Sequence, residues 1–335
     1  MTDEPPIGMP APEYRVGIEH FDVLDAGLST GLVAILNAGL ANTLVAGLAL
    51  HLPDPDTWRL TISGDVVASI NAIEEREEGN TYTLDRGVGQ VGGRTINAHD
   101  GTYDIVIGAE SFMPPFEVSS PEELVEYTHR IGLHLAIHES GHAILHQRGE
   151  DFAAFQDLVV GTMTERSWRK HLATHVDDFR IEKMTNRLAP SPASNVENIG
   201  DTLAHVRNEL TESSALCHTD GDAAAIRSST AVNDLLRVMT YLSAELGAGG
   251  PIIKGMRPQP LPEGWDEYLE EVWDAWALSL DRLKPADESM TVDELASVLA
   301  DLCKVVVVWS RSTVGYHFEM HEDGSWTADW SRSIY

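Results

Sequence analysis

The chain has 335 residues, of which 43% are hydrophobic and 23% are charged, a composition typical of a folded globular protein. Its formal net charge is −30 at pH 7, and a surface of that sign repels nucleic-acid phosphates and anionic lipids, so we expect neither nucleic acid nor a membrane as partner. The two cysteines, Cys217 and Cys303, exclude a disulfide framework and favour a cytoplasmic location. The acidity itself indicates high solubility or adaptation to a salt-rich setting.

The first third of the sequence, after a proline-rich start at 1–13, predicts helices and strands in alternation. Residues 26–52 lack acids, lysine and arginine and could cross a bilayer, but acidic flanks and missing basic anchors favour a buried helix. Residues 57–63 are typical of a strand, and residues 65–79 of a helix that ends at glycine. Residues 82–110 indicate glycine-punctuated β structure, whose GVGQVGG run lacks the context of a nucleotide-binding loop.

Two long helices follow, and each begins with a capping box, a serine or threonine followed three residues later by glutamate. Ser120 caps the first helix, which we expect from about residue 121 to residue 148. Thr162 caps the second, which we expect to end near Leu188. Because the connection between them is short, the two helices should lie side by side.

The remainder of the chain, from about residue 195, is mainly helical and carries no chemical signature. Residues 304–310 (KVVVVWS) predict a strand, and residues 315–331 predict a hairpin that turns at Asp323-Gly324. Six tryptophans in this part are more typical of a core or an interface than of a ligand platform. They are Trp265, Trp273, Trp276, Trp309, Trp326 and Trp330.

The first long helix carries four histidines at four-residue spacing in an apolar segment: His134, His138, His142 and His146. His138 to His142 forms an HExxH pattern, in which two imidazoles one turn apart can reach one metal ion. Glu139 then faces the open position of the ion and can take a proton from bound water. Buried imidazoles without partners would cost several kcal/mol, which favours a metal over histidines hydrogen-bonded in a core.

A di-iron carboxylate site is a weaker alternative for the same helix. Such a site needs a Glu-x-x-His pair on each of two helices. The second pair near the motif, Glu126 with His129, belongs to the same helix as Glu139 and cannot face it across a bundle. This reading is therefore disfavoured.

The second long helix offers the third protein ligand that a catalytic zinc requires. At 100° per residue, four polar side chains fall on one stripe beside the apolar face: His171, His175, Asp178 and Glu182. A solvated charged face would look similar, because each of these residue types is common on surfaces. The residues alone leave Asp178, Glu182 and His175 open as the third ligand.

This arrangement resembles the zincin metallopeptidases, most closely the gluzincin type, over roughly residues 57–188. In that family an HExxH helix is followed by a helix that brings an acidic ligand and, four residues later, a second acid. The resemblance implies that His138 and His142 bind zinc and that Glu139 is the general base. It implies Asp178 as the third ligand and Glu182 as the acid that orients a ligand histidine. The order of the two acids is reversed here, so the identity of the third ligand remains open.

The resemblance also implies a function and a partner. Zincins often bind extended peptide along an edge strand just before the HExxH helix, and residues 102–110 occupy that position. We expect a cytoplasmic zinc-dependent hydrolase, a metallopeptidase acting on peptides or proteins. Two alternatives are a zincin-like binding protein with a structural or inactive metal site, and a metal enzyme acting on a non-peptide small molecule.

The predicted fold is α+β, with a small zincin-like core and a mainly helical C-terminal region that ends in a β-hairpin. The expected parts are an N-terminal helix and β-sheet portion (1–115), the HExxH helix and ligand helix (116–190), and the helical region of unknown role (195–335). Substrate specificity and oligomeric state have no signal in the sequence.

Overall fold

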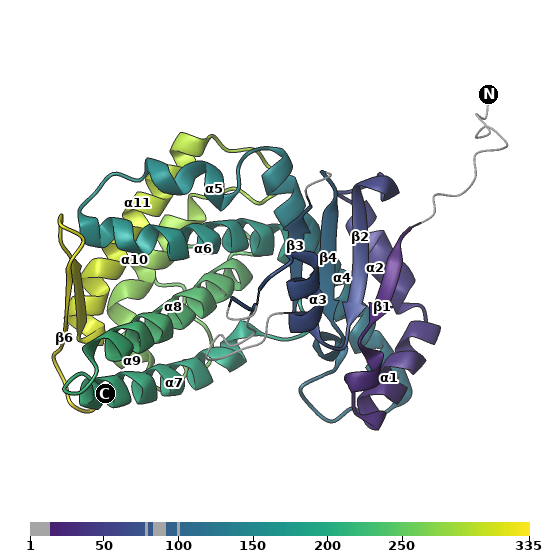
Figure 1. Ribbon diagram of the computed structural model, residues 1–335, viewed down its shortest axis with the longest axis horizontal. Helices are drawn as coiled ribbons and strands as arrows, with labels where there is room; N and C mark the ends of the chain where they lie inside the picture. Colours follow the sequence, from purple (N-terminus) through teal and green to yellow (C-terminus); the bar gives the residue numbers. More distant parts are fainter. Residues whose placement is uncertain (1–13, 78–79, 83–91, 99–100) are drawn as a thin grey trace. The chain divides into compact units, whose positions relative to one another are not determined.

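The computed structural model describes residues 14–77, 80–82, 92–98 and 101–335 (Figure 1). The described residues form two compact units, and the division falls after Ser140, inside one long helix. The first unit holds the described residues up to Ser140, and the second holds Gly141 to Tyr335. The 116–190 region, which holds the two long helices, is divided between the two units.

The first unit is built on a four-stranded mixed sheet in the order β1-β2-β4-β3. Its strands are β1 (Val16–Glu19), β2 (Trp58–Ser63), β3 (Gly93–Asn97) and β4 (Tyr103–Gly108). β2 is parallel to β1 and to β4, whereas β3 is antiparallel to β4. The expected α+β class, with a small mixed sheet, is confirmed.

The expectation that residues 102–110 form the edge strand is wrong. β4 is hydrogen-bonded to β2 on one side and to β3 on the other. Its Ile105, Val106 and Ile107 are fully buried, as is typical of a central strand covered on both faces. Among the described residues, β3 is the strand at this edge of the sheet. Of the segment 82–110 that the sequence predicts to be β structure, residues 83–91 and 99–100 lie outside the described part of the chain.

Helices pack beside this sheet. They are α1 (Ala26–Asn37), α2 (Leu40–Ala49), α3 (Val66–Ile73) and the first part of α4 (Pro121–Gln147), with the short turns η1 (Phe21–Val23), η2 (Pro55–Thr57) and η3 (Ala109–Phe112). α3 contacts β4 (Figure 1). α3 is shorter than the helix expected at 65–79. Residues 78–79 of that range lie outside the described residues.

The expected single helix at 26–52 is two helices, α1 and α2, bent by 64° at the break. Gly39 adopts φ 103° there, a left-handed conformation that glycine reaches without steric cost. Leu32, Ile35, Leu40 and Leu44 are nevertheless fully buried. Within the described residues, no single helix has the length and apolarity to cross a bilayer, although α1 and α2 taken together would meet that criterion.

The two long helices begin where the sequence predicts. The Glu123 amide donates to Ser120 Oγ at 3.1 Å at the start of α4, which ends at Gln147. Thr162 and Glu165 form a complete capping box at the start of α6 (Met163–Leu188). The connection between them contains α5 (Phe152–Phe155) and η4 (Gln156–Leu158).

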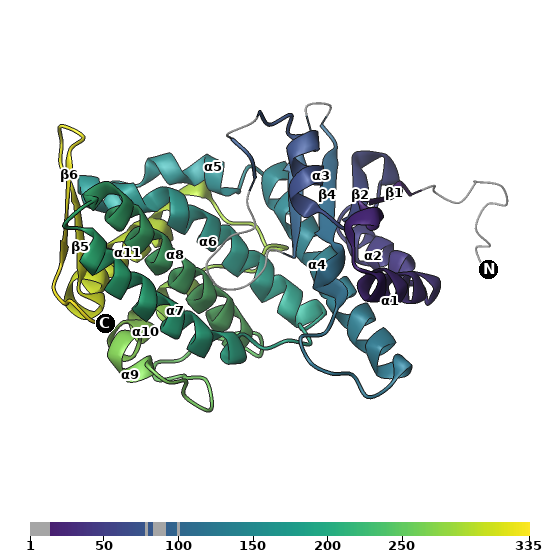
Figure 2. The same ribbon diagram turned by 60° about the horizontal axis from the view of Figure 1, so that its bottom comes forward.

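The second unit is a helical bundle closed by a hairpin. Besides α6 it contains α7 (Asn195–Leu216), α8 (Gly221–Leu246), α9 (Trp265–Tyr268), α10 (Glu270–Asp281), α11 (Val292–Trp309) and the π-helical turn η5 (Ser310–Val314). α7 and α8 lie side by side, and α6 packs against both α8 and α11 (Figure 2). Four of the six tryptophans are buried in one continuous core, as expected: Trp265, Trp273, Trp276 and Trp309.

The strand expected at residues 304–310 is wrong, because this segment is the last part of α11 and the start of η5. Leu295, Leu299, Leu302, Val306 and Trp309 are buried at helical spacing, so the apolar period of the whole segment overrides the β preference of four successive valines. The hairpin itself is confirmed. β5 (Tyr316–Met320) and β6 (Trp326–Trp330) pair antiparallel around the Asp323-Gly324 turn.

Candidate metal centre

Three side chains of metal-binding type meet where α4 and α6 approach each other. One ligand atom from each of His138, His142 and Asp178 lies within 4.8 Å of the other two. His142 Nε2 is 3.8 Å from Asp178 Oδ1, and both residues belong to the second unit. His138 precedes His142 by one turn of the same continuous helix, which fixes the two imidazoles relative to each other.

The donor set and its spacing fit a divalent metal. Zinc binds imidazole nitrogen and carboxylate oxygen at about 2.0–2.2 Å in tetrahedral geometry, which places neighbouring ligand atoms about 3.4 Å apart. The 3.8 Å separation of His142 and Asp178 needs only a small side-chain adjustment to reach that value. Two nitrogens and one oxygen leave a tetrahedral ion one position open, which is the composition of a catalytic rather than a structural site.

Gly141 explains how α6 comes close enough to α4. A Cβ at this position would lie 2.8 Å from Cγ2 of Ile181 and 3.2 Å from Cε of Met184. Any side chain inside the HESGH sequence at this point would therefore push α6 away. Ile181 follows Asp178 by about one turn, so the close approach allowed by Gly141 also brings the carboxylate to the histidines.

Glu139 is buried, with 2% of its surface exposed, and it is held by the edge strand of the first unit. Thr95 Oγ1 on β3 lies 2.8 Å from Glu139 Oε2 and 2.9 Å from the Glu139 backbone oxygen. A hydroxyl carries one proton, so Thr95 donates to these two acceptors in alternation. Either bond restrains the orientation of the glutamate.

The backbone of β3 also passes directly beside the Glu139 carboxylate. A Cβ at Gly93 would lie 2.7 Å from Oε1, so only glycine leaves room for the glutamate there. Gly93 and Thr95 are two residues apart and therefore share a face of the strand. Sequence reasoning missed both, because a separation of about 45 residues from Glu139 leaves no local spacing to detect.

The two outer members of the four-histidine series on α4, His134 and His146, lie in different surroundings. His134 is buried, with 6% of its surface exposed, and His138 is 9% exposed. His146 is exposed near the C-terminal end of the helix. The four-residue ladder is therefore continuous in sequence, but only its two middle members join the three-residue group.

The polar stripe of α6 separates into distinct environments. Among the described residues, the group within metal-binding distance includes Asp178 but neither His175 nor Glu182. His175 Nε2 lies 3.1 Å from Oδ1 of Asn233 on α8, and burial lowers the pKa of His175 to about 3. Glu182 is buried and accepts a hydrogen bond from Asn186 Nδ2 at 3.1 Å. His171, two turns before Asp178, is exposed.

Asp177, the neighbour of Asp178 in α6, is also buried. Its Oδ2 accepts a hydrogen bond from the Phe152 amide at 2.7 Å, at the start of α5. Burial raises the pKa of Asp177 well above its usual value, and this one hydrogen bond opposes the shift. The contact ties the middle of α6 to the segment that follows α4.

A buried ion pair adds a second tie between the same segments. Arg180 on α6 is fully buried and donates to Glu150 Oε2 at 2.8 Å and to the Glu288 backbone oxygen at 2.8 Å. Glu150 lies three residues beyond the end of α4 and also receives the amide of Met290 at 3.2 Å. Arg148 Nε is 3.2 Å from the other carboxylate oxygen of Glu150. This cluster, Arg148, Glu150 and Arg180, fixes α6 to the end of α4.

Comparison with protein-family models, with curated proteins and with solved structures finds no match for this chain.

Proposed function

We propose that this protein is a zinc-dependent hydrolase, a metallopeptidase with a zincin-like core. The observation that carries the proposal is the grouping of His138, His142 and Asp178 within 4.8 Å of one another, beside a buried Glu139 on the same helix as the two histidines. Three ligands and an adjacent carboxylate are the parts that a hydrolytic metal site requires. A zinc ion held by these residues supplies Lewis-acid activation of a water molecule and of the carbonyl group that is attacked.

Glu139 is the general base of the proposed reaction. It takes the proton of the attacking water and delivers it to the nitrogen of the leaving amine when the C–N bond breaks. The hydrogen bond from Thr95 Oγ1 holds one carboxylate oxygen, Oε2, so the glutamate is oriented before substrate arrives. Thr95 is thus a positioning residue that acts through Glu139.

A peptide substrate is supported by the position of β3. This strand ends the sheet among the described residues, and its Gly93 backbone passes beside Glu139. An extended peptide that adds to a sheet edge forms main-chain hydrogen bonds along it, independent of its side chains. Binding along β3 would therefore lay a peptide backbone next to the proposed general base. The strand that the sequence suggested for this role, 102–110, is central and has no edge to offer.

The test is peptide cleavage by zinc-loaded protein, read by mass spectrometry on a random peptide library. We expect cleavage by the wild type and a loss of at least about a hundredfold in kcat/KM for Glu139→Gln, which removes the base but keeps the metal ligands. Glu126→Gln is the matched control, because Glu126 is an exposed glutamate on the same helix. Its rate should equal that of the wild type.

Two results would contradict this assignment. Unchanged turnover in Glu139→Gln would remove the general-base role. A stoichiometric metal in a wild type that cleaves no library peptide would remove the peptidase assignment and leave the metal centre to another reaction.

A further inference from the structure

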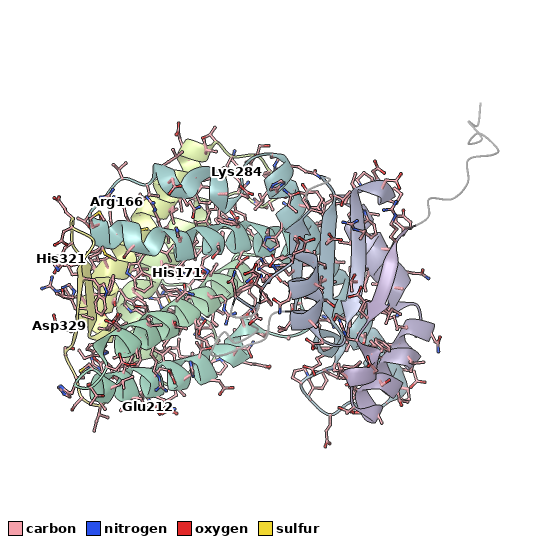
Figure 3. All side chains as sticks on the ribbon, viewed as in Figure 1. Arg166, His171, Glu212, Lys284, His321 and Asp329 are labelled. Atoms are coloured by element: carbon pink, nitrogen blue, oxygen red, sulfur yellow. The ribbon has the colours of Figure 1, made fainter. Side chains whose placement is uncertain are left out.

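A cavity in the second unit lies between α6, α8 and the C-terminal hairpin. Its volume is about 750 Å³, within the range of small-molecule sites. His171 of α6 contributes to its wall, and Figure 3 shows this residue between α6 and α8. One face of α8, from Asp222 to Asp234, and the hairpin residues Phe318, Met320 and Trp326 provide the rest.

The hairpin side of the cavity is an aromatic platform. The rings of Phe318 and Trp326 stack with centroids 5.9 Å apart and an interplanar angle of 30°. Trp326 is 36% exposed, unlike the four tryptophans of the core, and Ile226 on the facing helix is 69% exposed. Large apolar groups are therefore presented at the cavity.

The α8 side of the cavity is polar and acidic. Asp222 and Asp234 both line it, and no lysine or arginine is among the described residues of its wall. Arg237 approaches Asp234 at 3.7 Å but does not line the cavity. Although His171 keeps part of its surface exposed, desolvation lowers its pKa below the usual value, so the imidazole adds no positive charge near pH 7.

The polar wall is also fixed in place before any ligand binds. Ser229 Oγ lies 3.0 Å from the hydroxyl of Tyr316, which donates to the backbone of Ala225 at 3.1 Å. Asn233 is held by His175 of α6. The hairpin, α8 and α6 are therefore joined by hydrogen bonds around the cavity, and little ordering remains to oppose binding.

We propose that this cavity binds a small organic cation, an ammonium group attached to an aromatic or aliphatic body. Aromatic faces attract cations, most strongly the indole of tryptophan, and carboxylates supply the opposite charge. The body of the ligand covers the Phe318–Trp326 platform, and its ammonium group faces Asp222 and Asp234. The site uses none of the metal-binding residues, so it is independent of the proposed hydrolase activity.

Calorimetric titration with three matched probes tests the proposal: 2-phenylethylamine, 2-phenylethanol and phenylacetate. We expect saturable binding of one amine per chain, at least about tenfold tighter than the alcohol, and weakest binding for the anion. Trp326→Ala should weaken amine binding at least about tenfold, and Asp222→Asn about threefold or more. Asp329→Asn, on β6 outside the cavity wall, makes the same charge change and should leave amine binding unchanged.

The titration is repeated with His138→Ala, because a primary amine could also bind a metal. Retained affinity in that variant supports the cavity and keeps this test separate from the proposed hydrolase. Equal affinity for amine and alcohol would overturn the cationic class of ligand. Amine binding that is absent at millimolar concentration, lost in His138→Ala, or unchanged in Trp326→Ala would overturn the site.

Discussion

The two helices that meet at the candidate metal centre each present polar residues on one face, every four residues on α4 and every three or four on α6, but these residues have different roles. On α4, His138 and His142 join the metal-type group as the HExxH spacing predicts. On α6, only Asp178 of four stripe residues does so, while His175 contacts Asn233 and His171 lines a separate cavity. On α4 the HExxH pattern identifies the two histidines that join the group, whereas on α6 the neighbouring elements determine which polar residue does so.

The contrast follows from what each helix packs against. Gly141 lets α6 approach α4 next to Ile181, and Asp178, three residues before Ile181, is the α6 carboxylate that joins the two histidines. One turn earlier on α6 the neighbour is α8, which supplies Asn233 to His175. The sequence of α6 alone contains neither fact. Substitutions of α6 residues that contact other elements therefore test how much the packing of α6 depends on those contacts.

The largest effect on stability should come from the ion pair that anchors α6. Arg180→Met leaves Glu150 buried with only part of its hydrogen bonds, and breaking a buried pair typically costs about 3–5 kcal/mol of unfolding free energy. Chemical denaturation measures the change. Arg187→Met is the control, because its pairs with Asp287 and Glu288 are partly exposed and should contribute about 1 kcal/mol or less. Equal losses in the two variants would show that Arg180 does not anchor the helix.

The next effect concerns pH and His175. Its pKa is about 3 in the folded chain and about 6.5 when unfolded, so only the unfolded chain gains this proton as pH falls through that window. The contribution to stability is therefore fully present above pH 6.5 and is lost progressively towards pH 3. Between pH 6.5 and pH 5, the unfolding free energy lost through His175 should be about 2 kcal/mol.

Denaturation of metal-free protein at both pH values, compared with His175→Gln, measures this contribution. The variant should lose less stability than the wild type over that interval. Asp177 titrates in the opposite sense but is common to both proteins, so the difference isolates His175. His218→Gln, at an exposed position, should behave as the wild type. An identical pH dependence in His175→Gln and the wild type would contradict the buried neutral imidazole.

A smaller effect is expected on the α4 side. Thr95→Val removes the hydroxyl that restrains Glu139 while keeping the shape of the side chain. We expect kcat to fall about tenfold, with KM and metal content nearly unchanged, since the change affects orientation rather than binding. Thr95→Ser, which retains the donor, should recover most of the rate. A loss confined to KM would place Thr95 in substrate binding instead.

Much of the fold and part of the site could be predicted because the signals were local. Three of these signals involve residues no more than four positions apart: the capping box at Thr162, the Asp323-Gly324 turn and the HExxH spacing. The prediction of a strand at 304–310 is wrong because the helical spacing of buried side chains, which begins at Leu295, outweighs the β preference of the valines. The edge strand was misplaced because strand order in a sheet depends on pairing between distant segments.

The parts of the site that could not be predicted are long-range contacts. Thr95 reaches Glu139 across 44 residues, and Arg180 reaches Glu288 across 108. The cavity wall joins His171 to Trp326 through tertiary packing alone. In each case no local sequence pattern predicts the contact, so the pair is identified only in the folded structure.

The metal content of the purified protein tests the central claim most directly, measured by plasma mass spectrometry after zinc is supplied and excess removed. The account predicts about one zinc per chain in the wild type and in His171→Ala. It predicts loss in His138→Ala and a marked reduction in Asp178→Ala, although Asp178 and His171 share one stripe of α6. A folded wild type without metal, or equal zinc in all four proteins, would contradict it.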